Sequence, residues 1–327
     1  MNFTTFMLQP LLNLNPQAAA PCKRSTSAPI RVLVLGGRGF IGRHVVHALQ
    51  AQSNPVFGPV LIGSRQPSTS PQGPTAHIRQ VRFEQWLTPR DWLPLLGQVD
   101  VVINCVGILR QRPSESYDQV HHLAPAALAR ACAELKVRLI HTSALGLHQG
   151  AKSRFLSSKS LGEAAVHASG ADYAIVRPSL LDGVGGFGAT WLRGLARSPV
   201  HFIPRGARGG IAAMTATDLG QAFAVLAALP SLHHHREVEL GGLQHFSYAQ
   251  YLRVLRALYT PRKALQLPLP NWAARLGAHV CDLLHFSPFS YGHWILLQRD
   301  NLAVPNRLPE LLGREPTSIH LASAMPD

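Results

Sequence analysis

The sequence predicts an α/β fold: a doubly wound parallel sheet with a smaller C-terminal lid. Two observations support this prediction. Short apolar runs alternate with helical patterns between residues 32 and 178, as βαβ units require. A glycine cluster follows the first apolar run at once, where such a sheet turns from strand to helix. We therefore expect a Rossmann-like domain over residues 29–180 and a substrate or lid region over residues 181–327 that contributes one or more strands and helices.

The glycine cluster follows an expected strand at residues 32–35, and an amphipathic helical pattern starts at once, with Ile41, Val45, Val46 and Leu49 on one face. Gly36 allows a tight turn, Gly39 lets the backbone approach a pyrophosphate, and Gly42 lets the helix pack closely on the strand. The free N–H groups of the first helical turn then point at the anion. We expect the cofactor to contact this whole segment: Gly36, Gly37, Arg38, Gly39, Phe40, Ile41 and Gly42.

The remaining elements follow from apolar runs and helical periodicity. Further strands are expected at residues 60–64, 77–83, 101–105, 138–141, 173–176 and 237–240. Helices are expected at residues 89–96, 116–135 (bent or restarted by Pro125), 157–169, 190–195, 248–258, 272–284 and 291–297. The most apolar helical stretch, residues 219–229, is too short to cross a bilayer.

Composition limits the classes of partner. The formal net charge is +14, but the 26 Arg and 5 Lys are scattered and form no basic block, so no specific nucleic-acid binding is expected. The four cysteines have no CxxC spacing, which is typical of free thiols in a reducing compartment. The tract at residues 233–235 is three histidines without a Cys or Asp at ligand spacing, so no metal site is expected.

The first 28 residues contain no acid and include Lys23 and Arg24. This composition suits an organelle transit segment, and it equally suits a disordered tail or a start site assigned too far upstream. A bacterial cytoplasmic location is favoured. An organelle matrix is the alternative if residues 1–28 are a transit segment.

Five segments occur in the order seen in one known family. The chain resembles the extended and atypical short-chain dehydrogenases/reductases, in the branch that includes the nucleotide-binding accessory subunit of respiratory complex I and bacterial NAD(P)-binding proteins often fused to DoxX-type domains. The resemblance covers about residues 31–318. It rests on residues 36–42, 104–108, 141–146, Lys159 and 176–180, with further similarity at residues 296–302 and 311–316.

The resemblance implies a nicotinamide dinucleotide as cofactor. The end of the second strand usually selects between the two dinucleotides, with an acid for the ribose 2′-OH or an Arg for the 2′-phosphate. This chain has Ser64 and Arg65 there and no acid nearby in sequence, and Arg38 is a second guanidinium within reach. NADP(H) is therefore favoured over NAD(H). The alternative for Arg65 is a solvated surface side chain.

The resemblance also assigns the site around the nicotinamide. Lys159 would hold the nicotinamide ribose and Ser143 would orient the substrate, although the working hydroxyl position could fall on Ala144 instead. The family's general acid, a Tyr four residues before the Lys, is replaced by Phe155, which has no proton to give. Further cofactor contacts are implied at Cys105, Val106, Gly107, Pro178 and Ser179.

Two functions follow from this departure. The first is a cofactor-binding scaffold or weak oxidoreductase, with a protein or membrane-complex partner as for the complex I subunit. The alternative is an active NAD(P)H-dependent oxidoreductase or epimerase with a non-standard acid/base. Asp182 and His141 are candidates for that group, although no spacing singles them out. The lid has no motif that identifies the small-molecule substrate.

Overall fold

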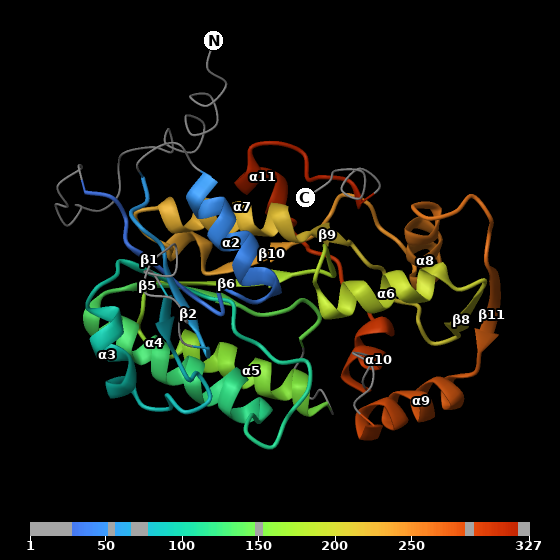
Figure 1. The fold of residues 1–327 in the computed structure, drawn as a ribbon, viewed down its shortest axis with the longest axis horizontal. Coiled ribbons are helices and arrows are strands. Elements are labelled where there is room, and N and C mark those ends of the chain that lie inside the picture. Colours follow the sequence, from blue (N-terminus) through green and yellow to red (C-terminus); the bar gives the residue numbers. More distant parts are fainter. Residues whose placement is uncertain (1–27, 52–55, 67–77, 148–152, 285–290, 320–327) are drawn as a thin grey trace, which may run out of the picture.

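The computed structural model describes residues 28–51, 56–66, 78–147, 153–284 and 291–319. Its central sheet has seven parallel strands in the order β10-β6-β5-β4-β1-β2-β3, which confirms the expected doubly wound α/β fold (Figure 1). The strands are β1 (Val32–Leu35), β2 (Leu61–Ser64), β3 (Ile78–Gln80), β4 (Val101–Asn104), β5 (Arg138–Thr142), β6 (Tyr173–Pro178) and β10 (Glu237–Leu240). Since β10 pairs with β6, the C-terminal half of the chain completes the sheet.

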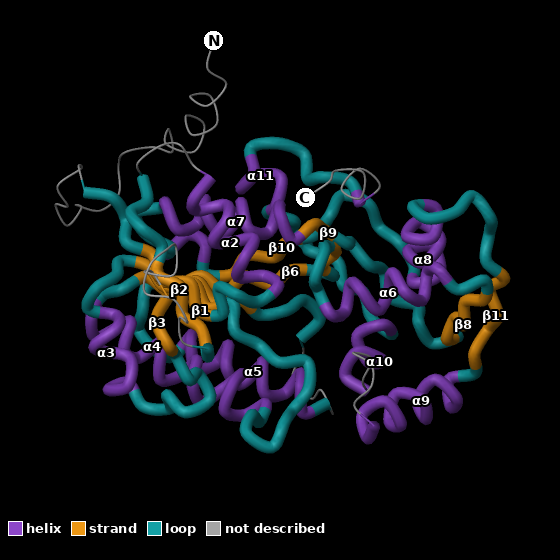
Figure 2. Tube along the Cα trace, viewed as in Figure 1, coloured by secondary structure: helices purple, strands orange, loops and turns teal. Residues whose placement is uncertain are grey.

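Helices cover both faces of the sheet (Figure 2). One layer holds α2 (Phe40–Ala51), α7 (Ala216–Ala228) and α11 (Leu308–Leu312), and the other holds α3 (Pro89–Leu96), α4 (Ala124–Leu135) and α5 (Arg154–His167). Side chains of β1 alternate between the two cores: Val32 and Val34 pack under α2 and α7, whereas Leu33 and Leu35 pack under α3 and α4. All four are fully buried, which explains why the strand is apolar throughout.

The lid lies beyond the carboxyl ends of the strands and is assembled from two separate stretches of chain (Figure 1). The first stretch leaves the sheet after β6, and the second leaves it after β10. Between them the chain returns to the sheet to form α7 and β10. The lid elements are β7 (Leu181–Asp182), α6 (Phe187–Arg197), β8 (Val200–Pro204), β9 (Met214–Thr215), α8 (Tyr248–Ala257), β11 (Leu265–Leu269), α9 (Asn271–Leu284) and α10 (Tyr291–Leu297).

Several element bounds differ from the expected ones for physical reasons. The helix expected at residues 116–135 passes through a π-helical turn, Gln119–Leu123, and continues directly into α4. Pro125, which has no N–H to donate, follows this turn, where the wider hydrogen-bond pattern interrupts the regular helix. Strand β3 is shorter than expected, and β6 continues through Pro178. The two small parallel pairs, β7 with β9 and β8 with β11, were not expected, because their strands are too short or too distant in sequence to show a pattern.

Among the described residues, no helix is long and apolar enough to cross a membrane. The same residues contain no group of three or more His, Cys, Asp or Glu side chains arranged to hold a metal ion. The N-terminal segment, apart from residue 28, lies outside the described residues, as does most of the loop after β2.

Gly42 fixes the contact between α2 and β1, and a side chain there should destabilise the fold. A Cβ at Gly42 would lie 2.2 Å from the Gly36 carbonyl oxygen and 2.7 Å from the Gly37 Cα. We expect Gly42→Ala to lower the free energy of unfolding by about 2 kcal/mol or more, measured by urea denaturation. Gly194→Ala is the control. Gly194 is an exposed position of α6, and a Cβ added there would have no atom within 4 Å. This substitution should raise the free energy of unfolding by up to about 1 kcal/mol. Equal urea midpoints for Gly42→Ala and wild type would contradict this assignment.

Candidate functional site

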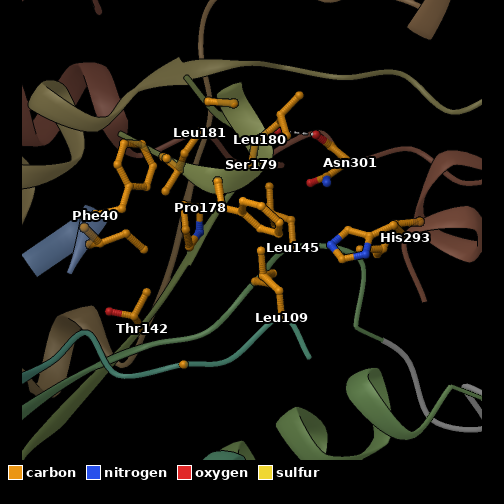
Figure 3. Close-up of a pocket in the computed structure, with 18 of the residues that line it drawn as sticks. Phe40, Leu109, Thr142, Leu145, Pro178, Ser179, Leu180, Leu181, His293 and Asn301 are labelled. Atoms are coloured by element: carbon orange, nitrogen blue, oxygen red, sulfur yellow. Dashed lines mark hydrogen bonds between the residues drawn. The ribbon is translucent and has the colours of Figure 1, made fainter. Parts of the chain in front are cut away.

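A cavity of about 470 Å³ lies between the carboxyl ends of the central strands and the lid. The glycine turn after β1 forms one wall, and the loops after β4, β5 and β6 form the floor. Figure 3 shows Phe40 and Thr142 toward one end of this cavity and His293 and Asn301 toward the other, with Pro178 and Leu145 between them. Ligands of doubly wound sheets bind at this edge, so the cavity is the candidate site.

Ten of the residues predicted from the sequence meet in this cavity. They come from five segments that are far apart in the chain. Four of these segments follow a strand or begin a helix, and the fifth, Lys159, lies in the second turn of α5. They are Gly39, Phe40, Ile41, Cys105, Val106, Gly107, Ser143, Lys159, Pro178 and Ser179. The others, Gly36, Gly37, Arg38, Gly42, Ser64 and Arg65, do not line it.

The glycine turn has the geometry that a diphosphate site requires. Gly36 adopts a positive φ of 71°, and its carbonyl accepts the Gly39 N–H at 2.8 Å. Gly39 is exposed, and a Cβ there would meet only the Gly36 carbonyl oxygen, at 3.1 Å. The backbone of this turn is therefore open toward the cavity, at the N-terminus of α2, where an anion is stabilised.

The end of β2 differs from the expectation that no acid is near. Arg65 is largely exposed and forms an ion pair with Glu115, whose side chain is buried in the loop between β4 and the π-helical turn. Glu115 is distant in sequence, so the chain pattern gave no sign of it. Arg38, in the glycine turn, is exposed. The end of β2 thus holds one guanidinium group, and that group is paired with a carboxylate.

Phe155, four residues before Lys159, lies in the wall of the cavity. It lies on α5, is buried, and is surrounded by the rings of Tyr117, His121 and His293 at centroid distances of 5.5–5.7 Å. Lys159, one turn later, places its Nζ 5.9 Å from the Phe155 ring centroid. His293 comes from α10 of the lid and stacks on Phe155, and the sequence gave no indication of this contact.

Lys159 is the only cationic side chain that lines the described cavity. Desolvation lowers the pKa of this amine to about 8, and the nearby Glu163 opposes the shift only in part. Both Glu163 oxygens accept hydrogen bonds from Arg177, at 2.9 and 2.7 Å, so that carboxylate is already engaged. The amine therefore titrates near physiological pH, in a range suited to proton exchange.

Ser143 presents a polar group that the protein leaves unsatisfied. Its hydroxyl is buried and, among the described residues, has no hydrogen-bond partner, although it lines the cavity. An unpaired buried hydroxyl is costly, so a ligand that hydrogen bonds to it recovers that cost. Ala144 also lines the cavity and offers no hydroxyl.

Neither of the other acid/base candidates reaches the cavity. His141 is buried, contacts the Asn104 side chain at 3.1 Å, and has its pKa lowered to about 3 by desolvation and by Lys159. Asp182 is buried in an ion pair with Arg193 at 2.7 Å. Both are structural, and neither is among the cavity-lining residues.

The lid side of the cavity is apolar. Among the described lid residues, no acidic, Lys or Arg side chain lines it, and the side chains there with a polar group are Trp191, Tyr248, Tyr251, His293 and Asn301. Burial raises the pKa of Tyr248 to about 12, so this phenol stays neutral. We call the lid side of the cavity the apolar chamber, and its lining residues include Leu181, Phe187, Trp191, Leu192, Ile211, Tyr251, Leu296 and Leu297.

Comparison with known proteins gives a family and several relatives. A family model described as NAD dependent epimerase/dehydratase family matches residues 32–208. Ceramide reductase from Caulobacter vibrioides is 32% identical over 177 residues, which are 54% of this chain and 54% of that protein. The mitochondrial NADH dehydrogenase (ubiquinone) 1 alpha subcomplex subunit 9 of Rattus norvegicus is 30% identical over 166 residues, 48% of this chain and 42% of that protein. The chain thus spans about half the length of the curated relatives that it matches.

Solved structures share the fold at low sequence identity. A nucleoside-diphosphate-sugar epimerase from Staphylococcus aureus superposes with a TM-score of 0.70 at 15% identity, over 90% of this chain and all of that one. An NADPH-dependent quinone oxidoreductase from Escherichia coli, solved with NADPH, superposes with a TM-score of 0.65 at 15% identity, over 90% of this chain and 98% of that one. At these identities the likeness establishes the fold alone.

The lowered pKa of Lys159 predicts a pH-dependent stability difference. An unfolded chain holds this proton up to its ordinary pKa of 10.5, whereas the folded chain releases it near pH 8. The charged amine therefore destabilises the fold below pH 8, and this cost disappears as the pH rises from 8 to 10.5. We expect Lys159→Met to melt at a higher temperature than wild type at pH 7. The difference between the two melting temperatures should shrink as the pH rises from 8 to 10.5. The exposed Lys263→Met is the control, and a Lys159→Met gap that is constant with pH would contradict the assignment.

Proposed function

Because this chain belongs to the NAD-dependent epimerase/dehydratase family, which binds NAD(P), we propose that it binds NADP(H) in this cavity, beside an apolar chamber for the substrate. The observation that supports the proposal best is continuity: one cavity runs from the glycine turn at Gly39, past Lys159, to the lid. The residues present suit the dinucleotide, because the turn offers open backbone and Ser143 offers an unpaired hydroxyl.

Each part of the dinucleotide then has a place. The backbone of residues 39–41 and the N-terminus of α2 would hold the pyrophosphate. Lys159 would bind the nicotinamide ribose, and the segment with Cys105, Val106 and Gly107 would lie along the cofactor. Pro178 and Ser179 would lie near the nicotinamide, where the Ser179 hydroxyl donates to the Asn301 carbonyl at 2.8 Å and so joins β6 to the lid. The cofactor supplies the hydride chemistry when bound.

The adenosine end supports NADP(H) over NAD(H). Arg38 and Arg65 offer two guanidinium groups near Ser64 for a 2′-phosphate, and Arg65 is already held by Glu115. The Glu115 carboxylate also opposes a phosphate by charge. NADP(H) is favoured because the guanidinium groups of Arg38 and Arg65 outnumber the one buried carboxylate, that of Glu115.

Reduction of an apolar carbonyl compound is the reaction that the chamber suits best. The relative named ceramide reductase acts, by its name, on ceramide, and an uncharged lid chamber fits a substrate with apolar chains. The nucleotide part of a nucleoside-diphosphate sugar would require cations in the chamber to balance its phosphates, and no Arg or Lys of the described lid residues lines it. Without the phenol at Phe155, proton supply falls to Lys159 or His293, and turnover should be slow.

A role as a cofactor-binding scaffold is the second candidate. Phe155 favours it, because an apolar ring in place of the family's acid preserves cofactor binding and removes the proton donor. A relative that is a subunit of NADH dehydrogenase also supports it. In this function the bound dinucleotide would stabilise the fold and an assembly with a protein or membrane-complex partner.

Gly39→Val tests the proposed binding site. The valine side chain would project from the exposed turn into the space proposed for the pyrophosphate, while its Cβ meets only one backbone oxygen at 3.1 Å. We expect the variant to fold and melt near the wild-type temperature and to lose dinucleotide affinity by about 100-fold or more, measured by titration calorimetry. A folded variant with wild-type affinity would show that the cofactor binds elsewhere.

Arg65→Ala tests the choice of cofactor. Loss of a charge-assisted contact to phosphate should weaken NADPH binding about tenfold and leave NADH binding within about twofold. Glu115→Gln should increase the affinity for NADPH relative to that for NADH, because it removes a buried negative charge beside Arg65. The control is Arg130→Ala on α4, an exposed arginine away from the cavity. Wild-type protein that binds NADH as tightly as NADPH would refute the preference.

Phe155→Tyr should restore a proton donor next to Lys159. The new hydroxyl would lie one helical turn from an amine whose charge lowers the pKa of a phenol. We expect unchanged NADPH affinity and a rise of about tenfold or more in the rate of NADPH oxidation with a ketone substrate. The rise should stay below the roughly 10²–10⁴-fold typical of general acid/base catalysis, because Ala144 offers no hydroxyl to orient the substrate. Fast wild-type turnover that survives Lys159→Ala would show that another group supplies the proton.

A further inference from the structure

Helix α9 has an apolar stripe that faces away from the protein. Its inner side packs through Ala274 and Ala278, which are buried against α10 and Trp294. Four large side chains, spaced three or four residues apart, lie on the opposite side with exposed fractions of 41–78%: Trp272, Leu276, Val280 and Leu283. Soluble helices ordinarily show the reverse pattern, with polar residues outward. These exposed side chains form an apolar stripe that is suited to contact a partner.

The ribbon that precedes α9 in the chain also exposes apolar side chains. Strand β11 leads into α9 through Pro270, and it pairs in parallel with β8. Phe202 and Leu267 are register partners on this ribbon and are both exposed, as is Leu265. In Figure 1 the ribbon and α9 lie at the edge of the lid, on the far side of the molecule from α3 and α4.

The lid around this stripe is strongly cationic. Residues 181–217 and 241–300 together contain ten Arg or Lys and three acids. The acids are Asp282, Asp300 and Asp182, the last of which pairs with Arg193. On α9 itself, Arg275 and His279 border the stripe, and both stack on Tyr291 of α10. Arg262 and Lys263 are exposed just before β11. An apolar helix face with Trp and Leu, set in basic surroundings, is the pattern of helices that lie in a membrane interface.

We propose that α9 and the β8–β11 ribbon dock on the surface of an anionic lipid bilayer. The stripe enters the boundary between headgroups and acyl chains, with α9 parallel to the membrane plane, while the lid arginines and lysines contact the anionic headgroups. Charge complementarity selects this occupant over a second copy of the chain, because two copies would bring two cationic lids together. The proposal is independent of whether the cavity binds a dinucleotide.

The docking face and the cavity share one helix. Helix α10 packs on α9, and its other side lines the cavity through His293, Leu296 and Leu297. A membrane-bound lid would therefore place an apolar chamber one helix away from the acyl chains.

Vesicle flotation with the full chain tests this proposal. We expect binding to vesicles of phosphatidylcholine with phosphatidylglycerol and little binding to phosphatidylcholine alone. Binding should fall when salt is raised from about 0.1 M to about 1 M, because the screening length shortens from about 10 Å to about 3 Å. The triple variant Trp272→Ser/Leu276→Ser/Leu283→Ser should lose at least tenfold in partition coefficient, and Arg262→Glu/Lys263→Glu should lose anionic selectivity.

Matched controls make the result decisive. Leu161→Ser and Leu135→Ser remove exposed leucines from α5 and α4 and should bind as wild type does. On addition of anionic vesicles, the fluorescence of wild type should shift to shorter wavelength, and Trp272→Phe should lose that shift. Absence of binding, equal loss in the control variants, or a dimer in solution that the triple variant abolishes would each overturn the proposal.

Discussion

The contact between the start of α2 and the end of β1 determines the rest of the site. Gly42 lies so close to the Gly36 carbonyl that only hydrogen fits between them. This contact brings the N-terminus of α2 to the carboxyl edge of the sheet, where the open backbone at Gly39 faces the cavity. The loops after β4, β5 and β6 start at the same edge of the sheet, because all these strands are parallel. One close helix–strand contact thus sets where an anion can bind and which side chains can surround it.

The second half of the site follows a different principle. The lid adds volume and apolar surface to the cavity, and its described residues place no Lys, Arg or acidic side chain there. Lys159 is desolvated, and the Ser143 hydroxyl has no hydrogen-bond partner among the described residues. Both effects favour a ligand that brings its own polar groups to one end of the cavity and apolar surface to the other. The ring of Phe155 fits this picture, because it continues the apolar wall through its contacts with Tyr117 and His293.

Local pattern was sufficient to predict most of the sheet and the glycine turn. Strands such as β1 are buried on both faces and are therefore unbroken apolar runs in the sequence. Helix α3 is flanked by Thr88 before its first turn and Gly97 after its last, residue types that are typical of helix starts and helix ends respectively. The ion pair of Arg65 with Glu115, and the stacking of His293 on Phe155, could not be predicted, because each joins residues far apart in sequence through tertiary packing alone. The short strands of the lid were missed for the same reason, since pairing of β8 with β11 depends on the fold around them.

Native mass spectrometry of the protein as purified tests the central claim most directly, namely that the cavity is a dinucleotide site. The claim predicts a population that has gained the mass of one NADP(H) per chain, and that takes up NADPH in preference to NADH when both are added. A protein that keeps its bare mass in the presence of excess NADPH and NADH would contradict the claim.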